Sequence, residues 1–304
     1  MMNLSILLAG LLALGLGCSE DDNAARPDSG LHSLQLSFQG LETLANGYHY
    51  EGWAIVGGVP VSTGKFNIDS SGNLVDLNGG AIAGGTFSVA EDLSNATAVV
   101  LTIEPAGDSD PDPAATHVLA GDLSSREGVL QAGHAAALGS DFTASAGVYV
   151  LATPTNGPET LENSGVWFLS LVGGSPARGL DLPALPAGWR YEGWMVMGGT
   201  PITTGTFTDP EAADDDAPYS DVQAAPPFPG EDFLLNAPDA LTFPTDLAGT
   251  TAVISIEPDP DDSAAPFAFK PLVAPVPSSA TDHVTYSMDN NAAGFPTGMA
   301  SIME

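Results

Sequence analysis

The chain has 304 residues, 43% of them hydrophobic, which exceeds the usual size of one small domain and supplies enough apolar material for packed cores. Six Lys and Arg against 38 Asp and Glu give a net charge of -32, which argues against binding to nucleic acid. The 35 Gly and 25 Pro, with few long helix-forming segments, favour short strands joined by turns and hence an all-β fold.

The first segment has the pattern of an export signal. An apolar run from Leu4 to Gly17 is too short to span a bilayer comfortably and ends in small residues at Cys18. It resembles a bacterial lipoprotein signal peptide over residues 1–17, with Cys18 as the lipidated residue; an ordinary cleaved signal is the alternative. Cys18 is the single cysteine, so an intramolecular disulfide and a cysteine-based zinc site are excluded. Ser19 after it favours the outer membrane or cell surface.

Residues 18–31 are polar and acidic and show no apolar periodicity, which predicts a disordered tether. The stretch that follows, "HSLQLSFQGL", opens a region in which strand-length apolar runs alternate with Gly, Pro and Asp clusters. We expect the first β-sandwich domain to cover residues 32–155.

The stretch "YEGWAIVGGVPVSTGKF" (Tyr50 to Phe66) predicts two strands joined by a Gly-Gly turn. It recurs as "YEGWMVMGGTPITTGTF" (Tyr191 to Phe207), with ten of seventeen positions identical. A second pair follows, "TAVVLTIEP" (Thr97 to Pro105) and "TTAVISIEP" (Thr250 to Pro258), in which proline ends a predicted strand. The chain therefore carries the same β unit twice.

The second domain is expected over residues 156–304. The distance between its two motifs is longer than in the first copy, and the extra residues fall in an acidic, Pro-rich insertion near residues 209–232. A stretch so rich in Pro, Asp and Ala predicts a surface loop.

The order of these motifs, followed by an Asp/Pro-rich loop and "THVLAGDL", resembles the extracytoplasmic C-terminal domain of anti-sigma-K factors. The resemblance runs from about Tyr48 to Leu123 and again from Gly188 to about Pro275. It implies a sensor-like domain outside the cytoplasm. Members of this family also carry a sigma-binding helical domain and a transmembrane helix, and neither pattern is found in this sequence.

Four glutamates recur in equivalent places. Glu51 and Glu192 lie inside predicted strands, and Glu104 and Glu257 end them. One interpretation is a paired acid/base or metal site in each domain. The other, which we favour, is a carboxylate on the solvated face, or one that caps backbone amides near the Gly-Gly turn, retained for structure.

The aromatic residues of the motif are Tyr50 and Trp53, with Tyr191 and Trp194 in the second copy, and Gly52 and Gly193 lie between them. Positions three apart on a strand point to opposite faces, so Tyr and Trp of one pair form no single binding platform. We expect packing roles for them, with ligand stacking as the alternative.

Asp108, Asp110 and Asp112 alternate along "GDSDPDP", and this spacing makes them weak calcium candidates. Pro113 and Leu119 stand where an EF-hand needs glycine and glutamate, so the loop is no EF-hand. Asp259, Asp261 and Asp262 offer a comparable loop in the second copy.

No nucleophile-and-base arrangement or phosphate-binding loop emerges, and no catalytic residue or cofactor is expected. The sequence therefore predicts a non-enzymatic, lipid-anchored envelope protein that acts in binding, sensing or envelope structure, with an unidentified partner. Regulation of sigma-factor signalling is a narrower form of this prediction. The alternative is a surface hydrolase or carbohydrate-active protein that uses the repeated carboxylates.

Overall fold

The structure is a computed structural model that describes residues 30–157, 160–239, 241–261 and 263–303. The expected signal peptide, Cys18 and nearly all of the expected tether lie outside the described residues. Leu31, the last residue assigned to the tether, is buried, and its backbone amide donates to Asp92 Oδ1 at 2.9 Å. The folded part therefore includes Leu31 and extends to the C-terminal strand.

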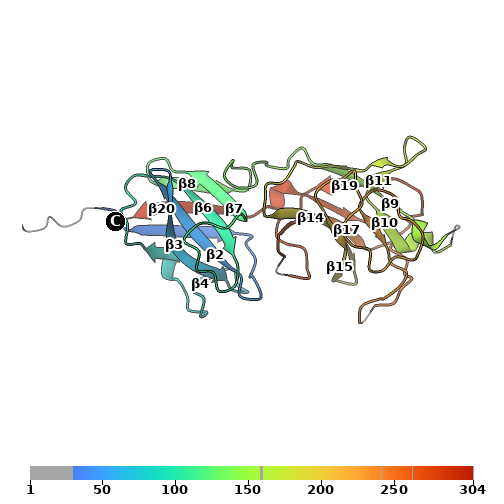
Figure 1. The fold of residues 1–304 in the computed structure, drawn as a ribbon, viewed down its shortest axis with the longest axis horizontal. Helices are drawn as coiled ribbons and strands as arrows, with labels where there is room; N and C mark the ends of the chain where they lie inside the picture. The colour runs from blue at the N-terminus through green and yellow to red at the C-terminus, as the bar shows by residue number, and fades with distance from the viewer. Residues whose placement is uncertain (1–29, 158–159, 240, 262, 304) are drawn as a thin grey trace, which may run out of the picture. The chain divides into compact units, whose positions relative to one another are not determined.

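Strands dominate the described residues, which confirms the all-β prediction (Figure 1). The first sheet has the strands β1 (Ser33–Gln39), β2 (His49–Val56), β3 (Val59–Ile68), β4 (Leu74–Val75), β5 (Thr86–Ser88), β6 (Ala96–Glu104), β7 (His117–Asp122), β8 (Glu127–Gln131) and β20 (Thr297–Met303). Its order is β4-β3-β2-β6-β7-β8-β20-β1-β5.

The second sheet has the strands β9 (Ala146–Leu151), β10 (Gly165–Trp167), β13 (Leu180–Asp181), β14 (Trp189–Met197), β15 (Thr200–Phe207), β16 (Gly230–Asp232), β17 (Thr251–Pro258), β18 (Leu272–Pro275) and β19 (Tyr286–Asn290). Its order is β15-β14-β17-β18-β19-β9-β10-β16, and β13 pairs with β9. A small separate ladder joins β11 (Leu169–Ser170) to β12 (Ala177–Arg178). The remaining elements are short 3-10 helices: η1 (Ala83–Gly85), η2 (Pro154–Asn156), η3 (Glu162–Ser164) and η4 (Ala292–Gly294).

The hairpin of the repeated motif has the same geometry in both sheets. Tyr50 pairs with Phe66 and Tyr191 with Phe207, and a bulge follows the glycine of each Tyr-Glu-Gly-Trp. Both glycines of each Gly-Gly turn have positive φ, 59° and 83° in the first copy and 59° and 90° in the second. Two successive left-handed residues make a two-residue hairpin turn, which explains why Gly-Gly is present in both copies.

Gly52 and Gly193 are required by close packing. A Cβ at Gly52 would lie 2.6 Å from Thr63 Oγ1, and one at Gly193 would lie 2.2 Å from Thr204 Oγ1. These distances leave no room for a side chain, so the glycine of each Tyr-Glu-Gly-Trp motif is fixed by the neighbouring strand.

Each sheet curls so that its two ends approach. In the first sheet, the rings of Phe66 on β3 and Phe87 on β5 pack at a tilt with centroids 5.5 Å apart, although these strands lie near opposite ends of the order. Large apolar side chains fill the enclosed space, among them Leu36, Tyr50 and Leu101, all 1% exposed or less. One curled sheet therefore provides both walls of the core.

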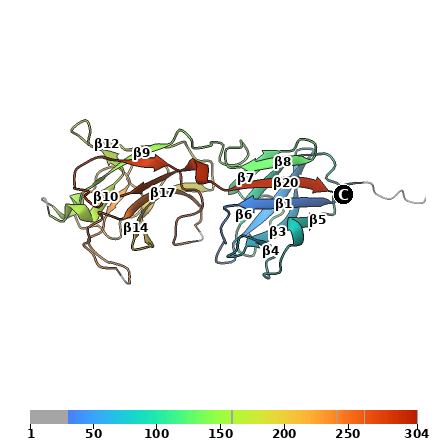
Figure 2. The ribbon, with the colours of Figure 1, turned by 180° about the vertical axis from the view of Figure 1, so that it is seen from behind.

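Apart from β4, which has no counterpart, the strand orders of the two sheets correspond position by position, and one strand in each sheet comes from beyond the predicted domain boundary. β20 lies between β8 and β1, which Figure 2 shows as a red strand beside a blue and a green one. In the second sheet the equivalent place, between β19 and β10, is taken by β9. The sheets therefore cross the predicted boundary at residue 155, and that domain division stays a prediction.

Candidate functional site

The repeated aromatic residues are buried. Tyr50 is 0% exposed and Trp53 2%, and Tyr191 and Trp194 are 1% and 2% exposed. Tyr50 belongs to the main core, whereas Trp53 packs with Val100, Ala120 and Ala137 in a separate cluster. The prediction that such a pair faces two directions is thus confirmed for the first copy, and a ring that is 2% exposed or less offers no surface on which a ligand could stack.

A chain of hydrogen bonds joins the two repeated motifs. Trp53 Nε1 donates to Thr102 Oγ1 at 2.9 Å, and the Thr102 hydroxyl donates to Glu104. In the second sheet Trp194 Nε1 donates to Ser255 Oγ at 2.7 Å, and Ser255 donates to Glu257. Each tryptophan therefore reaches a buried glutamate on the neighbouring strand through one hydroxyl.

The strand-ending glutamates also hold the loop that follows them. The backbone amide of Ala114 donates to Glu104 Oε1 at 3.0 Å, and that of Phe267 donates to Glu257 Oε1 at 2.9 Å. Both glutamates are 1% exposed. The amide-capping interpretation describes these two residues, although the amides they cap lie in the Asp/Pro-rich loop and not at the Gly-Gly turn.

Glu51 lies in a cluster that contains its own counter-charge. Ligand atoms of His49, Glu51 and Asp108 lie within 4.8 Å of one another. Lys65, which pairs with Glu51 in the β2–β3 hairpin, places Nζ 2.8 Å from Asp108 Oδ2 and 3.6 Å from Glu51 Oε2. The hydrogen bond from Lys65 lowers the pKa of Asp108. The lysine ammonium therefore offsets one of the two carboxylate charges of this cluster.

Glu192 lies in the equivalent cluster of the second sheet, which is composed of carboxylates. Oxygens of Glu192, Glu257 and Asp261 lie within 4.8 Å of one another. The position of Lys65 is taken by Thr206, which pairs with Glu192 as Lys65 does with Glu51. Burial, with the nearby charge of Asp261, raises the pKa of Glu192 to about 7.

Burial likewise raises the pKa of Glu257 to about 8, and the charges of Glu192 and Asp261 add to the shift. Asp261 is exposed, while Glu192 and Glu257 are at most 5% exposed. The cluster thus has two buried carboxyl groups and opens to solvent at Asp261.

The Asp residues of the predicted calcium loop do not converge. Asp108 is engaged by Lys65, while the exposed Asp110 accepts the backbone amide of Asp112 at 3.1 Å in a local turn. Neither Asp110 nor Asp112 belongs to a group of convergent ligands among the described residues. Calcium binding by this loop stays a prediction.

The acidic insertion ends in a buried strand. Asp232 of β16 is 0% exposed, and its carboxylate accepts Trp167 Nε1 at 2.8 Å and the backbone amide of Thr155 at 2.8 Å. Glu231 is 0% exposed as well, and burial raises its pKa to about 7. The expected surface loop therefore precedes residue 230, and the acidic residues that close it are part of the sheet.

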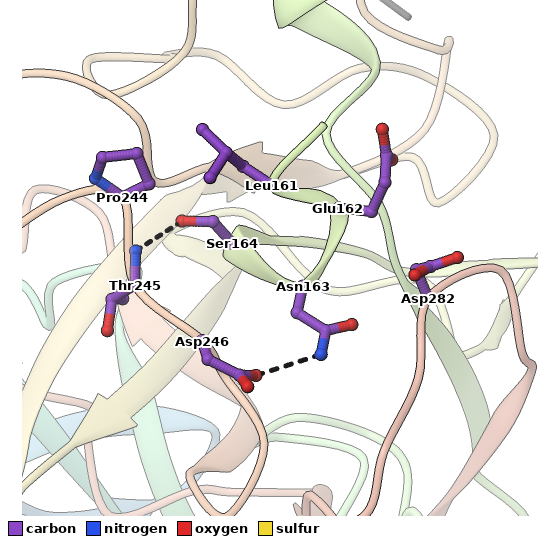
Figure 3. Close-up of a pocket in the computed structure, with 8 residues that line it drawn as sticks. All are labelled: Leu161, Glu162, Asn163, Ser164, Pro244, Thr245, Asp246 and Asp282. Carbon is purple, nitrogen blue, oxygen red and sulfur yellow. Dashed lines mark hydrogen bonds between the residues drawn. The ribbon is translucent and has the colours of Figure 1, made fainter. Parts of the chain in front are cut away.

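One pocket of about 320 Å³ lies at η3 (Figure 3), and its lining residues are Leu161, Glu162, Asn163, Ser164, Pro244, Thr245, Asp246 and Asp282. The Ser164 hydroxyl donates to the Phe233 carbonyl at 2.7 Å and accepts the Thr245 amide at 2.8 Å. Asn163 donates to Asp246 Oδ1 at 3.1 Å. Because both hydrogen-bonding functions of Ser164 are used by backbone groups, the pocket presents no activated serine nucleophile among its lining residues.

Both copies share the spacing Glu-Pro-x-x-Asp, which places Asp108 after Glu104 and Asp261 after Glu257. This spacing is the sequence signal for the aspartate in each cluster. The sequence interpretation named every carboxylate of both clusters, but it did not associate Lys65 or Thr206 with them. Strand register carries that information, because position 65 lies opposite Glu51 and position 206 opposite Glu192.

Residues 26–118 match the family model described as anti-sigma-K factor rskA, C-terminal. The resemblance indicated by the motifs is thereby confirmed for the first copy, and this segment is similar to the C-terminal domain of that family. The match does not extend to the second copy. No curated protein and no solved structure matches the chain. Within the described residues, no helix has the length and apolar character needed to cross a membrane.

Proposed function

We propose that the protein is an exported, lipid-anchored recognition module of the cell envelope that takes part in sigma-factor regulation and has no catalytic activity of its own. The observation that carries the proposal is the match of residues 26–118 to the C-terminal domain of anti-sigma-K factors. Lipidation at Cys18 and an outer-membrane or cell-surface location follow from the signal-like pattern that ends there.

The burial of the repeated residues supports a role without catalysis. Glu51, Glu104, Glu192 and Glu257 are between 1% and 5% exposed, so a substrate does not reach them without rearrangement of the sheet. The aromatic residues of the motif are equally inaccessible. What the two copies retain in common is therefore the framework of the sheet, and this favours recognition over the hydrolase alternative.

The net charge of -32 also bears on the partner. A chain of this charge is repelled by acidic surfaces and associates faster with a basic partner. We therefore propose a protein partner in the envelope that regulates a sigma factor, with contacts that weaken as salt is added.

The test is genetic and uses the full chain. In the native bacterium, deletion of the gene is expected to change the transcripts controlled by one alternative sigma factor, and the wild-type chain is expected to restore them. A Cys18→Ala chain, which keeps the folded part and lacks the lipidation site, is expected to restore them poorly and to escape labelling by radioactive palmitate.

Unchanged transcripts after deletion would contradict the regulatory role, and equal labelling of wild type and Cys18→Ala would contradict the anchor. Catalytic activity is assayed separately. Turnover of glycoside or ester substrates that is lost in Glu51→Gln or Glu192→Gln would replace the proposal with the hydrolase alternative.

A further inference from the structure

We propose that Glu192, Glu257 and Asp261 form a binding site for one divalent cation of the calcium type. The site is independent of the proposed function and is absent from the first sheet, where the corresponding place holds the ammonium group of Lys65.

Geometry gives the first argument. Carboxylate oxygens of the three residues lie within 4.8 Å of one another. Two oxygens that both bind an ion at about 2.4 Å, the usual calcium–oxygen distance, are at most about 4.8 Å apart. Oxygen ligands are also the ones that calcium prefers.

An unpartnered buried atom gives the second argument. Glu192 is 5% exposed, and its Oε2 has no hydrogen-bond partner in the structure. A buried carboxylate oxygen without a partner is costly, and such groups are normally paired or coordinate a metal. Glu192 belongs to the convergent group, and one of its carboxylate oxygens lies within 4.8 Å of oxygens of Glu257 and Asp261.

Comparison of the two sheets gives the third argument. In the first sheet, Lys65 Nζ lies 3.6 Å from Glu51 Oε2 and supplies a positive charge to the cluster. In the second sheet, position 206 is threonine, and Arg190, which replaces His49, directs its guanidinium to Asp215 and Asp259. A bound cation restores at the second cluster the charge that the lysine provides at the first.

The other contacts of the cluster concern charge and access from solvent. Glu257 is held by the Ser255 hydroxyl and the Phe267 amide, which fix its carboxylate without adding positive charge. Lys270 interacts electrostatically with Glu257, but its ammonium donates to the Phe267 carbonyl at 2.6 Å and is outside the convergent group. Asp261 is exposed, so a cation reaches the cluster from solvent on that side. Three carboxylates with one open side predict affinity in the range of extracellular calcium modules, with a dissociation constant on the order of 10⁻⁴ M.

The experiment titrates the full chain with Ca²⁺ by calorimetry in physiological salt, which screens weak binding by the other acidic groups. Tb³⁺ luminescence excited through tryptophan is a second measurement, because Trp194 is joined to Glu257 through Ser255. The wild type is expected to bind one ion saturably and to unfold at a higher temperature in Ca²⁺ than in EDTA.

Thr206→Lys is the decisive variant, since it places in the second cluster the side chain that the first cluster has. It is expected to weaken Ca²⁺ binding at least ~10-fold and to unfold in EDTA at or above the wild-type temperature. Glu192→Gln, nearly identical in shape, is expected to lose binding as well and decides the question if Thr206→Lys fails to fold. Asp110→Asn, which removes an acid from the other loop, is the matched control and is expected to bind as the wild type does.

Lys65→Thr is the reciprocal variant, and a second Ca²⁺ site in it would support the argument drawn from the first sheet. Absence of saturable binding at millimolar Ca²⁺ in the wild type would overturn the proposal. So would equal affinity in wild type, Thr206→Lys and Glu192→Gln, and loss of binding in Asp110→Asn would assign the ion to the first Asp-rich loop.

Discussion

Trp53 and Trp194 show how the identical residues of the two copies depend on one another. Each ring is 2% exposed, and each indole nitrogen donates to a hydroxyl that in turn donates to a buried glutamate. Thr102 in one copy and Ser255 in the other serve equally well, because the chain of hydrogen bonds requires only a hydroxyl at that position. The partial identity of the "TIEP" and "SIEP" motifs follows from this requirement.

Trp53→Phe removes the indole donor while it keeps an aromatic ring. We expect the variant to lose about 1–3 kcal/mol of folding stability, because a buried hydrogen bond is lost and the smaller ring leaves a cavity. Trp194→Phe is expected to behave alike, since its contacts are equivalent. Urea denaturation followed by circular dichroism measures both.

A third variant, Val59→Ala, changes an exposed side chain of the same hairpin and serves as the control. It is expected to shift stability by less than about 0.5 kcal/mol. Unchanged stability in both tryptophan variants would mean that the rings are not part of the packed structure.

At the residue scale, the sequence predicted from strand alternation that Tyr and Trp of each motif point to opposite faces, and from the size of the rings that they pack. It did not predict that Glu51 lies beside Lys65 while Glu192 lies beside Thr206. The two pairings depend on the hairpin register, which is set by the turn and by a bulge after Gly52 and Gly193, and a local pattern does not specify a bulge.

At the scale of elements, the hairpins were predictable, since Gly-Gly between two runs of β-branched and aromatic residues determines both strands and turn. The place of β20 in the first sheet and that of β9 in the second were not predictable. "TGMASIM" and "AGVYVL" share little beyond one glycine, and contacts between strands far apart in sequence leave no local signal. The domain boundary at residue 155 placed each of these strands with its sequence neighbours for this reason.

A disulfide tests the position of β20. Ser37 on β1 faces Met299 on β20 in the antiparallel register, and both side chains are exposed. Directly opposed residues have a separation of Cα atoms that a disulfide can bridge. In a Cys18→Ser background, Ser37→Cys with Met299→Cys is expected to oxidise to one intramolecular disulfide, measured by peptide mass spectrometry.

The control pair is Ser37→Cys with Val148→Cys. Val148 occupies on β9 the place that Met299 occupies on β20, as the glycines before them align. This pair is expected to stay reduced. Oxidation of the control pair in monomeric protein, with the first pair reduced, would show that β9 closes the first sheet.

At the scale of the whole molecule, buried carboxyl groups are combined with a net charge of -32. Burial raises the pKa of Asp214 to about 8, and its Oδ2 accepts the backbone amide of Gly230 at 2.8 Å. An acid whose folded pKa is raised binds its proton more tightly in the folded state. The stability that this acid contributes to the folded state is present at acidic pH and is lost as the pH rises through the folded pKa.

We therefore expect the free energy of unfolding to fall as the pH rises from about 4 to about 8 and then to level off. Asp214→Asn, which is uncharged at every pH and keeps an oxygen acceptor for Gly230, is expected to flatten part of this dependence and to be more stable than the wild type at pH 8. Urea denaturation at several pH values in EDTA provides the measurement. A free energy of unfolding that rises across this range would contradict the assignment of Asp214 as a partly buried acid that keeps its proton at neutral pH.

The place of β20 has a consequence for the order in which the protein is assembled during synthesis. The second sheet draws its strands from Ala146 to Asn290, so all of them are synthesised before β20. The first sheet has eight strands near the start of the chain and must wait for the ninth at Thr297–Met303. Until then β1 and β8 have open edges, which are surfaces prone to aggregation. A protein exported as an unfolded chain would meet this hazard outside the cytoplasm, where holding chaperones of that compartment would have to protect the two edges.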